Sequence, residues 1–266
     1  MEKPTTAQGP KRGAFRLLGG ILVRPRATLR AAVEESPRSW WLPALLTLAT
    51  VVLPILVGAP IRVQQQREAI AAVQEPLIEG ASPEQQQQME RALEAVTSPL
   101  LVTIFPSVSA VLGLVVGWLV WAGALYLLGM AIGSRASFGA LFRTVVWAWI
   151  PYAVRGLLQS LYILATGRLI AHPGLSGLVL SPQTKGAIAT PPTPGQMVAA
   201  SVLGRVDLFL FWNLALLVIG TAIATRLSTR KATVLVAVIW LVLTGLALLP
   251  TLMGAMWMRQ SGIFGG

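Results

Sequence analysis

The stretch from 206 to 249 constrains this chain most, because it holds two long apolar runs separated only by a short basic segment, Arg226 to Lys231. A helix rises ~1.5 Å per residue, so each run of ~20 residues can cross the ~30 Å hydrocarbon core of a bilayer. The whole chain is 55% hydrophobic and 12% charged, whereas soluble domains carry about 25% charged residues. These features predict an all-α membrane protein with several spans.

We expect five membrane-spanning helices that form a transmembrane bundle. The five predicted spans are 40–61, 104–132, 144–166, 206–225 and 232–253. The remaining segments would be a cytoplasmic basic segment with an interfacial helix (1–39), an outer helical loop (62–103), an outer loop (167–205) and an outer tail (254–266). The loop between the first two spans is predicted to be a helical hairpin, because Ser82, Pro83 and Gln85 have the spacing of a capping box at a helix start.

Basic residues gather in the segments that would face the cytoplasm if the N-terminus is inside, which is the positive-inside pattern. The inner basic face predicted in this way consists of Arg24, Arg26, Arg30, Arg135, Arg143, Arg226, Arg230 and Lys231. This placement explains the net charge of +11 by orientation in a cell membrane, with the C-terminus outside, rather than by nucleic-acid binding. A basic inner face also attracts the anionic headgroups of the bilayer.

A polar stripe is predicted on one face of the third span. It consists of Tyr152, Arg155, Gln159 and Tyr162, which fall at i, i+3, i+7 and i+10. An arginine inside the bilayer is costly and should point toward a partner, and Asp207, the chain's only aspartate, is the candidate. We therefore predict an Arg155–Asp207 pair that fixes two spans. The alternative is a small channel or transporter whose polar path runs along Tyr152, Arg155 and Gln159, with Asn213 as a further lining residue.

Glycines in the second span predict close helix packing. Gly113 with Gly117 and Gly129 with Gly133 have the spacing of small-xxx-small pairs, which let helix backbones approach closely. The partner is either another helix of the same bundle or a second copy of the chain.

The sequence shows no catalytic, metal-binding or cofactor-binding constellation. There is no Cys and only one His, and none of the common metalloprotease, hydrolase or phosphate-loop motifs occurs. The string Gly174 to Gly177 (Gly-Leu-Ser-Gly) is similar to one found in rhomboid proteases. However, that chemistry needs a histidine from a separate helix, and His172 lies only four residues before Ser176. We expect a protein without enzymatic activity or cofactor.

Three segments resemble the Yip-domain family. The closing segment matches at Asp207, Leu208, Phe209, Trp212, Ile219 and Gly220. The N-terminal segment matches at Pro25, Thr28, Leu29, Arg30, Glu34 and Glu35. An inner loop matches at Gly133, Ser134, Ser137 and Phe138. The resemblance covers roughly residues 20–250, and the Gln-rich outer hairpin departs from the shorter loop typical of the family.

The resemblance implies five membrane helices and no enzymatic activity. Eukaryotic members interact with Rab-type GTPases in vesicle traffic, and some bacterial members assist ABC-type exporters. The chain has seventeen Arg and four Lys, which is typical of a GC-rich bacterial genome and favours the bacterial branch. The resemblance therefore implies an accessory or scaffold subunit of a membrane complex of the transporter or trafficking type, with a membrane protein such as an ABC-type exporter as its partner.

Overall fold

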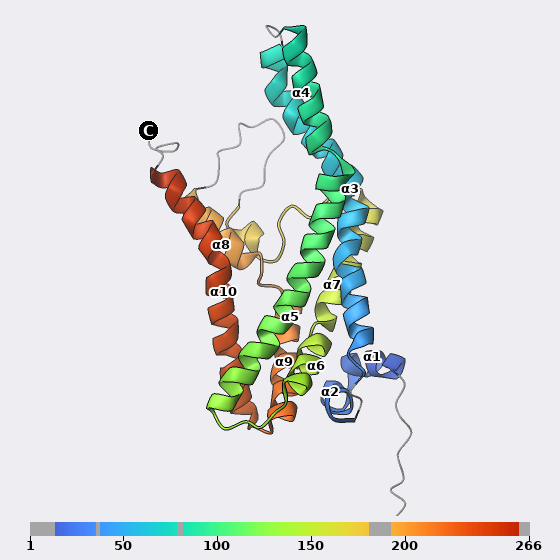
Figure 1. Ribbon diagram of the computed structural model, residues 1–266, viewed down its shortest axis with the longest axis vertical. Helices are drawn as coiled ribbons and strands as arrows, with labels where there is room; N and C mark the ends of the chain where they lie inside the picture. Colours follow the sequence, from blue (N-terminus) through green and yellow to red (C-terminus); the bar gives the residue numbers. More distant parts are fainter. Residues whose placement is uncertain (1–13, 36–37, 79–81, 181–192, 261–266) are drawn as a thin grey trace, which may run out of the picture. The chain divides into compact units, whose positions relative to one another are not determined.

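A computed structural model describes residues 14–35, 38–78, 82–180 and 193–260. Every regular element within these ranges is helical, which confirms the all-α prediction for them. The elements are α1 (Ala14–Val23), α2 (Pro25–Arg30), η1 (Ala31–Glu35), α3 (Trp41–Ile78), α4 (Pro83–Val96), η2 (Leu100–Ile104), α5 (Phe105–Ala131), α6 (Phe138–Ala148), α7 (Ile150–Thr166), η3 (Ser176–Leu178), α8 (Pro194–Leu203), α9 (Leu208–Thr225) and α10 (Thr229–Gln260) (Figure 1).

Four helical segments of the described residues are long and apolar enough to cross a membrane. They are Trp41–Ala71, Pro83–Ala131, Leu208–Thr225 and Thr229–Gly254. The chain is thus a multi-pass membrane protein, and four of the five predicted spans overlap these segments.

The predicted third span, 144–166, is wrong as a single helix. It is divided between α6 and α7, which have 11 and 17 residues, and neither is among the candidate spans of the described residues. Pro151 is the physical reason, because proline has no N–H and its ring crowds the carbonyl four residues earlier. The Trp149 N–H bonds the Val146 carbonyl at 3.3 Å, three residues back, and ends α6. That α6 and α7 together cross the membrane stays a prediction.

The first helix of the predicted hairpin is not separate from the first span, whereas the second helix begins where it was predicted to begin. The first span and the first helix of the hairpin form one 38-residue helix, α3. Gln64 and Glu68 support its polar half through a side-chain hydrogen bond of 2.9 Å. The capping box of α4 is confirmed, since the Ser82 N–H donates to Gln85 Oε1 at 3.0 Å and the Ser82 side chain accepts from the Gln85 N–H. The expected tail at 254–266 is helical as far as Gln260, and 261–266 lie outside the described residues.

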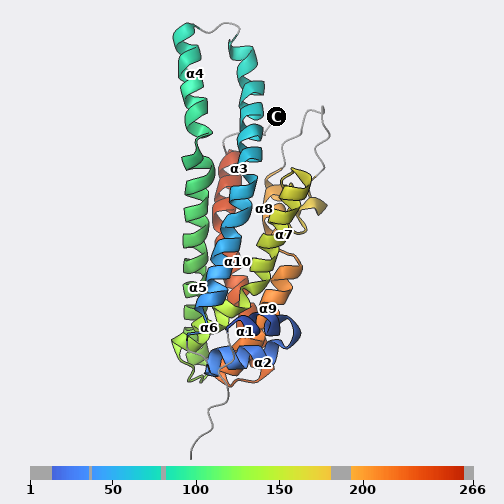
Figure 2. The same ribbon diagram turned by 90° about the vertical axis from the view of Figure 1, so that its right-hand side faces the viewer.

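The chain divides into two compact units, which are described separately. The first consists of Met1–Leu45, Trp118–Pro151 and His172–Gly266, and the second of Leu46–Gly117 and Tyr152–Ala171. In the first unit, α9 packs against α6, α10 and α2, and α8 packs against α10 (Figures 1 and 2). The largest fully buried side chains of this unit include Trp147, Ile21, Leu29, Leu125, Leu141, Leu216 and Leu217.

Close approach of α6 and α9 in the first unit depends on Gly220. A Cβ added at this position would lie 2.5 Å from Thr144 Cγ2. The Thr144 hydroxyl donates to the Ala140 carbonyl at 3.0 Å and lies 3.5 Å from the Gly220 carbonyl. A glycine of the Yip-like closing segment is therefore a helix-packing residue.

In the second unit, α7 packs through a stripe of mostly small residues. Ala153, Gly156, Ser160 and Ile163 are buried at helical spacing. A Cβ at Gly156 would overlap the carbonyl oxygen of Thr50 in α3. A Cβ at Gly113 or Gly117, in contrast, would meet no atom within 4 Å among the described residues. Gly156 is therefore a small residue with a packing partner in this unit, and the packing role of Gly113 and Gly117 stays a prediction.

Gly129 and Gly133, in the first unit, lie at the end of α5. A Cβ at Gly129 would contact Ser134 at 3.6 Å. Gly133 has φ +88°, a conformation that favours glycine, and among the described residues beyond its chain neighbours no atom lies within 4 Å of its Cβ position. Gly133 therefore serves the turn after α5, and the packing role predicted for this pair stays a prediction.

Candidate functional site

One face of the N-terminal helices carries charged side chains. Arg26, Arg30 and Glu34 follow one another at intervals of four residues along α2 and η1, so they lie on the same face. The opposite face packs into the unit, where Thr28 is 4% and Leu29 0% exposed. Because that face is buried, the charged side chains lie on the other face of α2, next to the end of α9.

The end of α9 has an unusual backbone at Arg226. This residue has φ 58° and ψ 20°, the left-handed region, and it is the one described residue other than glycine with a positive φ. A residue with a Cβ pays roughly 1–2 kcal/mol for this conformation. After Arg226 the chain turns at once into α10, where the Ser228 hydroxyl oxygen accepts from the Lys231 N–H at 3.4 Å. The turn of 226–228 thus separates two helices long enough to span a membrane.

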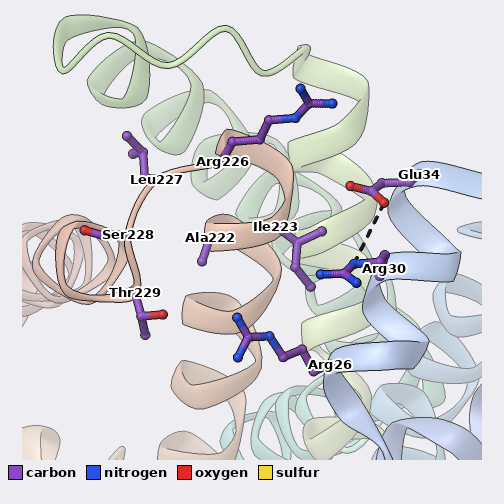
Figure 3. Close-up of a pocket in the computed structure, with 9 residues that line it drawn as sticks. All are labelled: Arg26, Arg30, Glu34, Ala222, Ile223, Arg226, Leu227, Ser228 and Thr229. Carbon is purple, nitrogen blue, oxygen red and sulfur yellow. Dashed lines mark ion pairs between the residues drawn. The ribbon is translucent and has the colours of Figure 1, made fainter.

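A pocket of about 330 Å³ opens between α2, η1 and this turn (Figure 3). Its lining residues are Arg26, Arg30, Glu34, Ala222, Ile223, Arg226, Leu227, Ser228 and Thr229, and we call it the basic pocket. Figure 3 shows Arg26 and Arg30 reaching from α2 toward the end of α9. Three arginines and one glutamate give the lining a formal charge of +2.

The glutamate neutralises little of this charge. Arg30 Nε and Glu34 Oε2 are 4.0 Å apart, with side chains 60% and 47% exposed, and exposed pairs of this kind are worth at most about 1 kcal/mol. Within the part of the chain that the structure describes, Arg26 and Arg226 form no ion pair with a carboxylate. The basic pocket therefore has excess positive charge.

The other residues of the predicted inner basic face have different surroundings. Arg24, Arg135, Arg230 and Lys231 are exposed. Arg143 instead donates from Nη2 to the Val33 carbonyl at 2.8 Å, which ties α6 to η1. Burial lowers the pKa of the Arg143 guanidinium. Three of the eight predicted residues thus line one pocket, and a fourth, Arg143, makes a hydrogen bond that links two helical elements.

Polar side chains join the end of α6 to its neighbours. Asn213 is 2% exposed, and its Nδ2 donates to the Ala148 carbonyl at 2.7 Å. That carbonyl belongs to the last turn of α6, where helix carbonyls lack an intrahelical partner. Trp147 Nε1 lies 3.3 Å from Ser39 Oγ, which in turn donates to the Ala32 carbonyl at 3.0 Å. Asn213 therefore has a structural hydrogen bond that sequence reasoning did not assign.

The predicted polar stripe lies on the continuous helix α7. Tyr152, Arg155 and Gln159 are half-buried, and Tyr162 is 43% exposed. The pairing of Arg155 with Asp207 would join the second unit to the first, and it stays a prediction. Asp207 has a further role that the sequence analysis missed, because its Oδ1 accepts from the Leu210 N–H at 2.8 Å and caps α9.

The Gly-Leu-Ser-Gly string forms a structural turn. Ser176 is 3% exposed, and its hydroxyl donates to the Pro173 carbonyl at 2.7 Å. Gly174 has φ +58°, and a Cβ there would lie within 2.8 Å of the backbone oxygens that end α8. Among the described residues, no group of three or more His, Cys, Asp or Glu side chains could hold a metal ion.

Comparison with known proteins gives one family match. The family model described as the Yip1 domain matches residues 19–252. No curated protein and no solved structure matches the chain significantly. The matched range begins in α1 and ends in α10, so it includes the basic pocket and the polar links around α6.

Proposed function

Since this chain belongs to the Yip1 domain family, we propose that it is a non-enzymatic accessory or scaffold subunit of a membrane complex, of the transporter or trafficking type. The observation that carries this proposal is how three polar side chains of the first unit are used. The buried Asn213 and Trp147 and the half-buried Arg143 each hydrogen-bond to a neighbouring element. These side chains therefore build a fixed support, and the charged and apolar side chains on the surface are left to contact other molecules.

The proposed orientation has the N-terminus in the cytoplasm and the C-terminus outside, in the cell membrane of a bacterium. It is supported by basic residues in three separate places: in and before α2, between α5 and α6, and at the turn between α9 and α10. Clusters of arginine and lysine beside membrane spans favour the cytoplasmic side. In this orientation the basic pocket belongs to the cytoplasmic surface.

The proposed contact with a membrane-protein partner, of the ABC-exporter class, is α4. This helix has a capping box at its start, and Met89 and Leu93 lie four residues apart near its middle. Both side chains are half-buried, and Val96 near the end of the helix is 44% exposed. An ordered helix with a narrow apolar stripe is suited to pack against another helix.

The test is co-purification of the full-length protein from its native membrane in mild detergent. A membrane transporter or ATPase subunit should co-elute at a fixed ratio. The double variant Met89→Glu/Leu93→Glu should reduce its recovery at least about tenfold, because two charges on the apolar stripe exclude helix packing. The matched variant Gln87→Glu/Ala92→Glu adds the same charge at exposed positions and should keep the partner. A partner-free wild-type protein would contradict the accessory role.

A small channel or transporter is the second candidate. It is favoured by Tyr152, Arg155 and Gln159, which are half-buried on one face of α7. The test is solute flux into proteoliposomes that contain only this protein. If the wild type shows flux and Arg155→Gln loses it with the fold intact, the channel or transporter role replaces the accessory role.

A further inference from the structure

We propose that the basic pocket binds the phosphate group of an anionic phospholipid headgroup. Its lining has a formal charge of +2, which suits a phosphate group carrying one to two negative charges. Guanidinium groups bind phosphate oxygens through two parallel hydrogen bonds, more specifically than a point charge does. The proposal does not depend on the identity, or the existence, of a protein partner.

The arginines that line the pocket come from two elements. Figure 3 shows Arg26 and Arg30 extending from α2 toward α9, and Arg226 extending from the end of α9 in a direction away from Arg26. Like charges that line one pocket without a full set of carboxylates repel one another, and a bound anion removes this repulsion. Ser228 adds a donor, because its oxygen accepts from the Lys231 N–H and its own O–H can still donate to a ligand.

The backbone at Arg226 points to the same use. A helix that ends in the left-handed conformation usually has glycine there, yet this chain has an arginine with φ 58°. Strained residues of this kind cluster at ligand clamps and are held in place by the surrounding structure. A bound anion at the Arg226 guanidinium would be one interaction that offsets the cost of this backbone conformation.

The location of the pocket identifies a lipid as the source of the phosphate. The turn of 226–228 lies between the candidate spans Leu208–Thr225 and Thr229–Gly254, so it is at the level of the headgroups. Ala222, Ile223 and Leu227 add apolar lining beside the charges, as the glycerol and first acyl carbons of a lipid require. On neighbouring α1, Leu22 is 56% and Val23 78% exposed, which suits a helix lying on a membrane.

The size of the pocket agrees with this ligand. Its volume of about 330 Å³ equals that of roughly ten water molecules at ~30 Å³ each. A glycerophosphate group has a similar number of heavy atoms. The pocket is thus large enough for a phosphate headgroup, and the acyl chains of the lipid would stay in the bilayer.

The test measures binding of dioctanoyl phosphatidic acid to the full-length protein in neutral detergent, by native mass spectrometry. The double variant Arg26→Gln/Arg226→Gly should bind at least about tenfold more weakly, since charge-assisted hydrogen bonds are lost. The matched variant Arg24→Gln/Arg230→Gln removes the same charge from residues outside the pocket and should change binding less than about twofold. Thermal unfolding checks the fold, and the glycine at 226 should leave stability unchanged or raise it.

Two competing ligands decide between a lipid and a soluble phosphate. Dioctanoyl phosphatidylcholine, which is zwitterionic, should compete poorly, and inorganic phosphate should require at least about a hundredfold higher concentration because it lacks the apolar contacts. If inorganic phosphate binds as tightly as phosphatidic acid, the lipid assignment is overturned. If both double variants lose the same affinity, binding is general attraction to the basic face and the proposal is wrong. Unchanged binding in the pocket variant overturns it as well.

Discussion

In the first unit, a side chain of α9 hydrogen-bonds to the backbone at the end of α6, whereas in the second unit α3 and α7 approach each other closely at Gly156. Asn213 of α9 donates to the Ala148 carbonyl of α6. In the second unit the Thr50 hydroxyl donates to the Leu46 carbonyl and the Ser160 hydroxyl to the Gly156 carbonyl, each at 2.8 Å and within its own helix. Both helix pairs nevertheless use a glycine for close approach.

The difference teaches what a helix break contributes to a membrane bundle. Carbonyls inside an intact helix already accept an intrahelical N–H, so a donor from a neighbouring helix makes only a longer second contact there, as the Thr144 hydroxyl does at 3.5 Å from the Gly220 carbonyl. The last carbonyls of α6 are available because the helix ends just before Pro151. Asn213 and Ala148 thereby gain a bond that fixes one helix against another in a single register. In the second unit, the close approach of α7 to α3 depends on a glycine, because a Cβ at position 156 would overlap the Thr50 carbonyl oxygen.

The largest effect is expected from Gly156→Ala. The added Cβ would overlap the Thr50 carbonyl oxygen, and because backbone cannot rotate away, the helices must separate at a cost of about 3 kcal/mol. Gly113→Ala is the matched control, since no described atom lies within 4 Å of that Cβ position. The control should be neutral or stabilise the helix by up to about 1 kcal/mol. Thermal unfolding in detergent measures both.

Two outcomes of this comparison would change the interpretation. Equal stability of the two variants would show that α3 and α7 do not rely on close contact at Gly156. A loss of stability or a change of oligomeric state in Gly113→Ala would show that the Gly113 and Gly117 face packs against a second copy of the chain.

The next effect concerns the hydrogen bond that joins α6 to α9. Asn213→Leu replaces the amide by an apolar side chain of similar length. The Ala148 carbonyl then loses its donor, which should cost about 2 kcal/mol. Ser160→Ala removes a bond inside one helix and should cost only about 0.5 kcal/mol. Unfolding in denaturant measures the ratio. Similar losses in both variants would mean that bonds between helices and bonds within helices stabilise this protein equally.

A smaller effect is expected from the predicted Arg155–Asp207 pair. Asp207→Asn is the informative change, because asparagine can still cap α9 while the negative charge is lost. Combined with Arg155→Gln in a double-mutant cycle, it should give a coupling of about 1 kcal/mol, within the range of polar pairs in membrane proteins. A coupling of zero would show that Asp207 acts only as the helix cap.

The sequence predicted local features better than it predicted which helices meet. The apolar run at 206–225 and the capping box at Ser82 were predicted because their signals are contiguous in the chain. The break at Pro151 was missed, although proline is a clear signal, because the surrounding apolar run was long enough for one span. The sequence placed eight basic residues on one predicted inner face, but it did not predict that Arg26, Arg30 and Arg226 line the same pocket. Their shared pocket depends on how α2 packs on α9, which no local pattern encodes.

Helix α8 shows a signal that was present and not used. Thr193, Pro194 and Gln196 repeat the pattern of Ser82, Pro83 and Gln85, and both sets form capping boxes. The first set predicts the start of a helix, whereas the second set was assigned to the outer loop 167–205, where proline and glycine are frequent. The capping pattern is therefore a stronger indicator here than the composition of the surrounding segment.

The smallest effects should come from removing these two caps, and they sharpen the comparison of the units. Ser82→Ala and Thr193→Ala each remove a side-chain cap worth about 1 kcal/mol. In the second unit, residues 82–88 are all exposed, so the loss should appear as roughly fivefold faster amide exchange in the first turn of α4. In the first unit, α8 packs against α10, and this contact should limit the change in exchange to less than about twofold. Faster exchange in α8 than in α4 would mean that packing on α10 does not hold α8 in place, and that the first unit depends on local capping as much as the second.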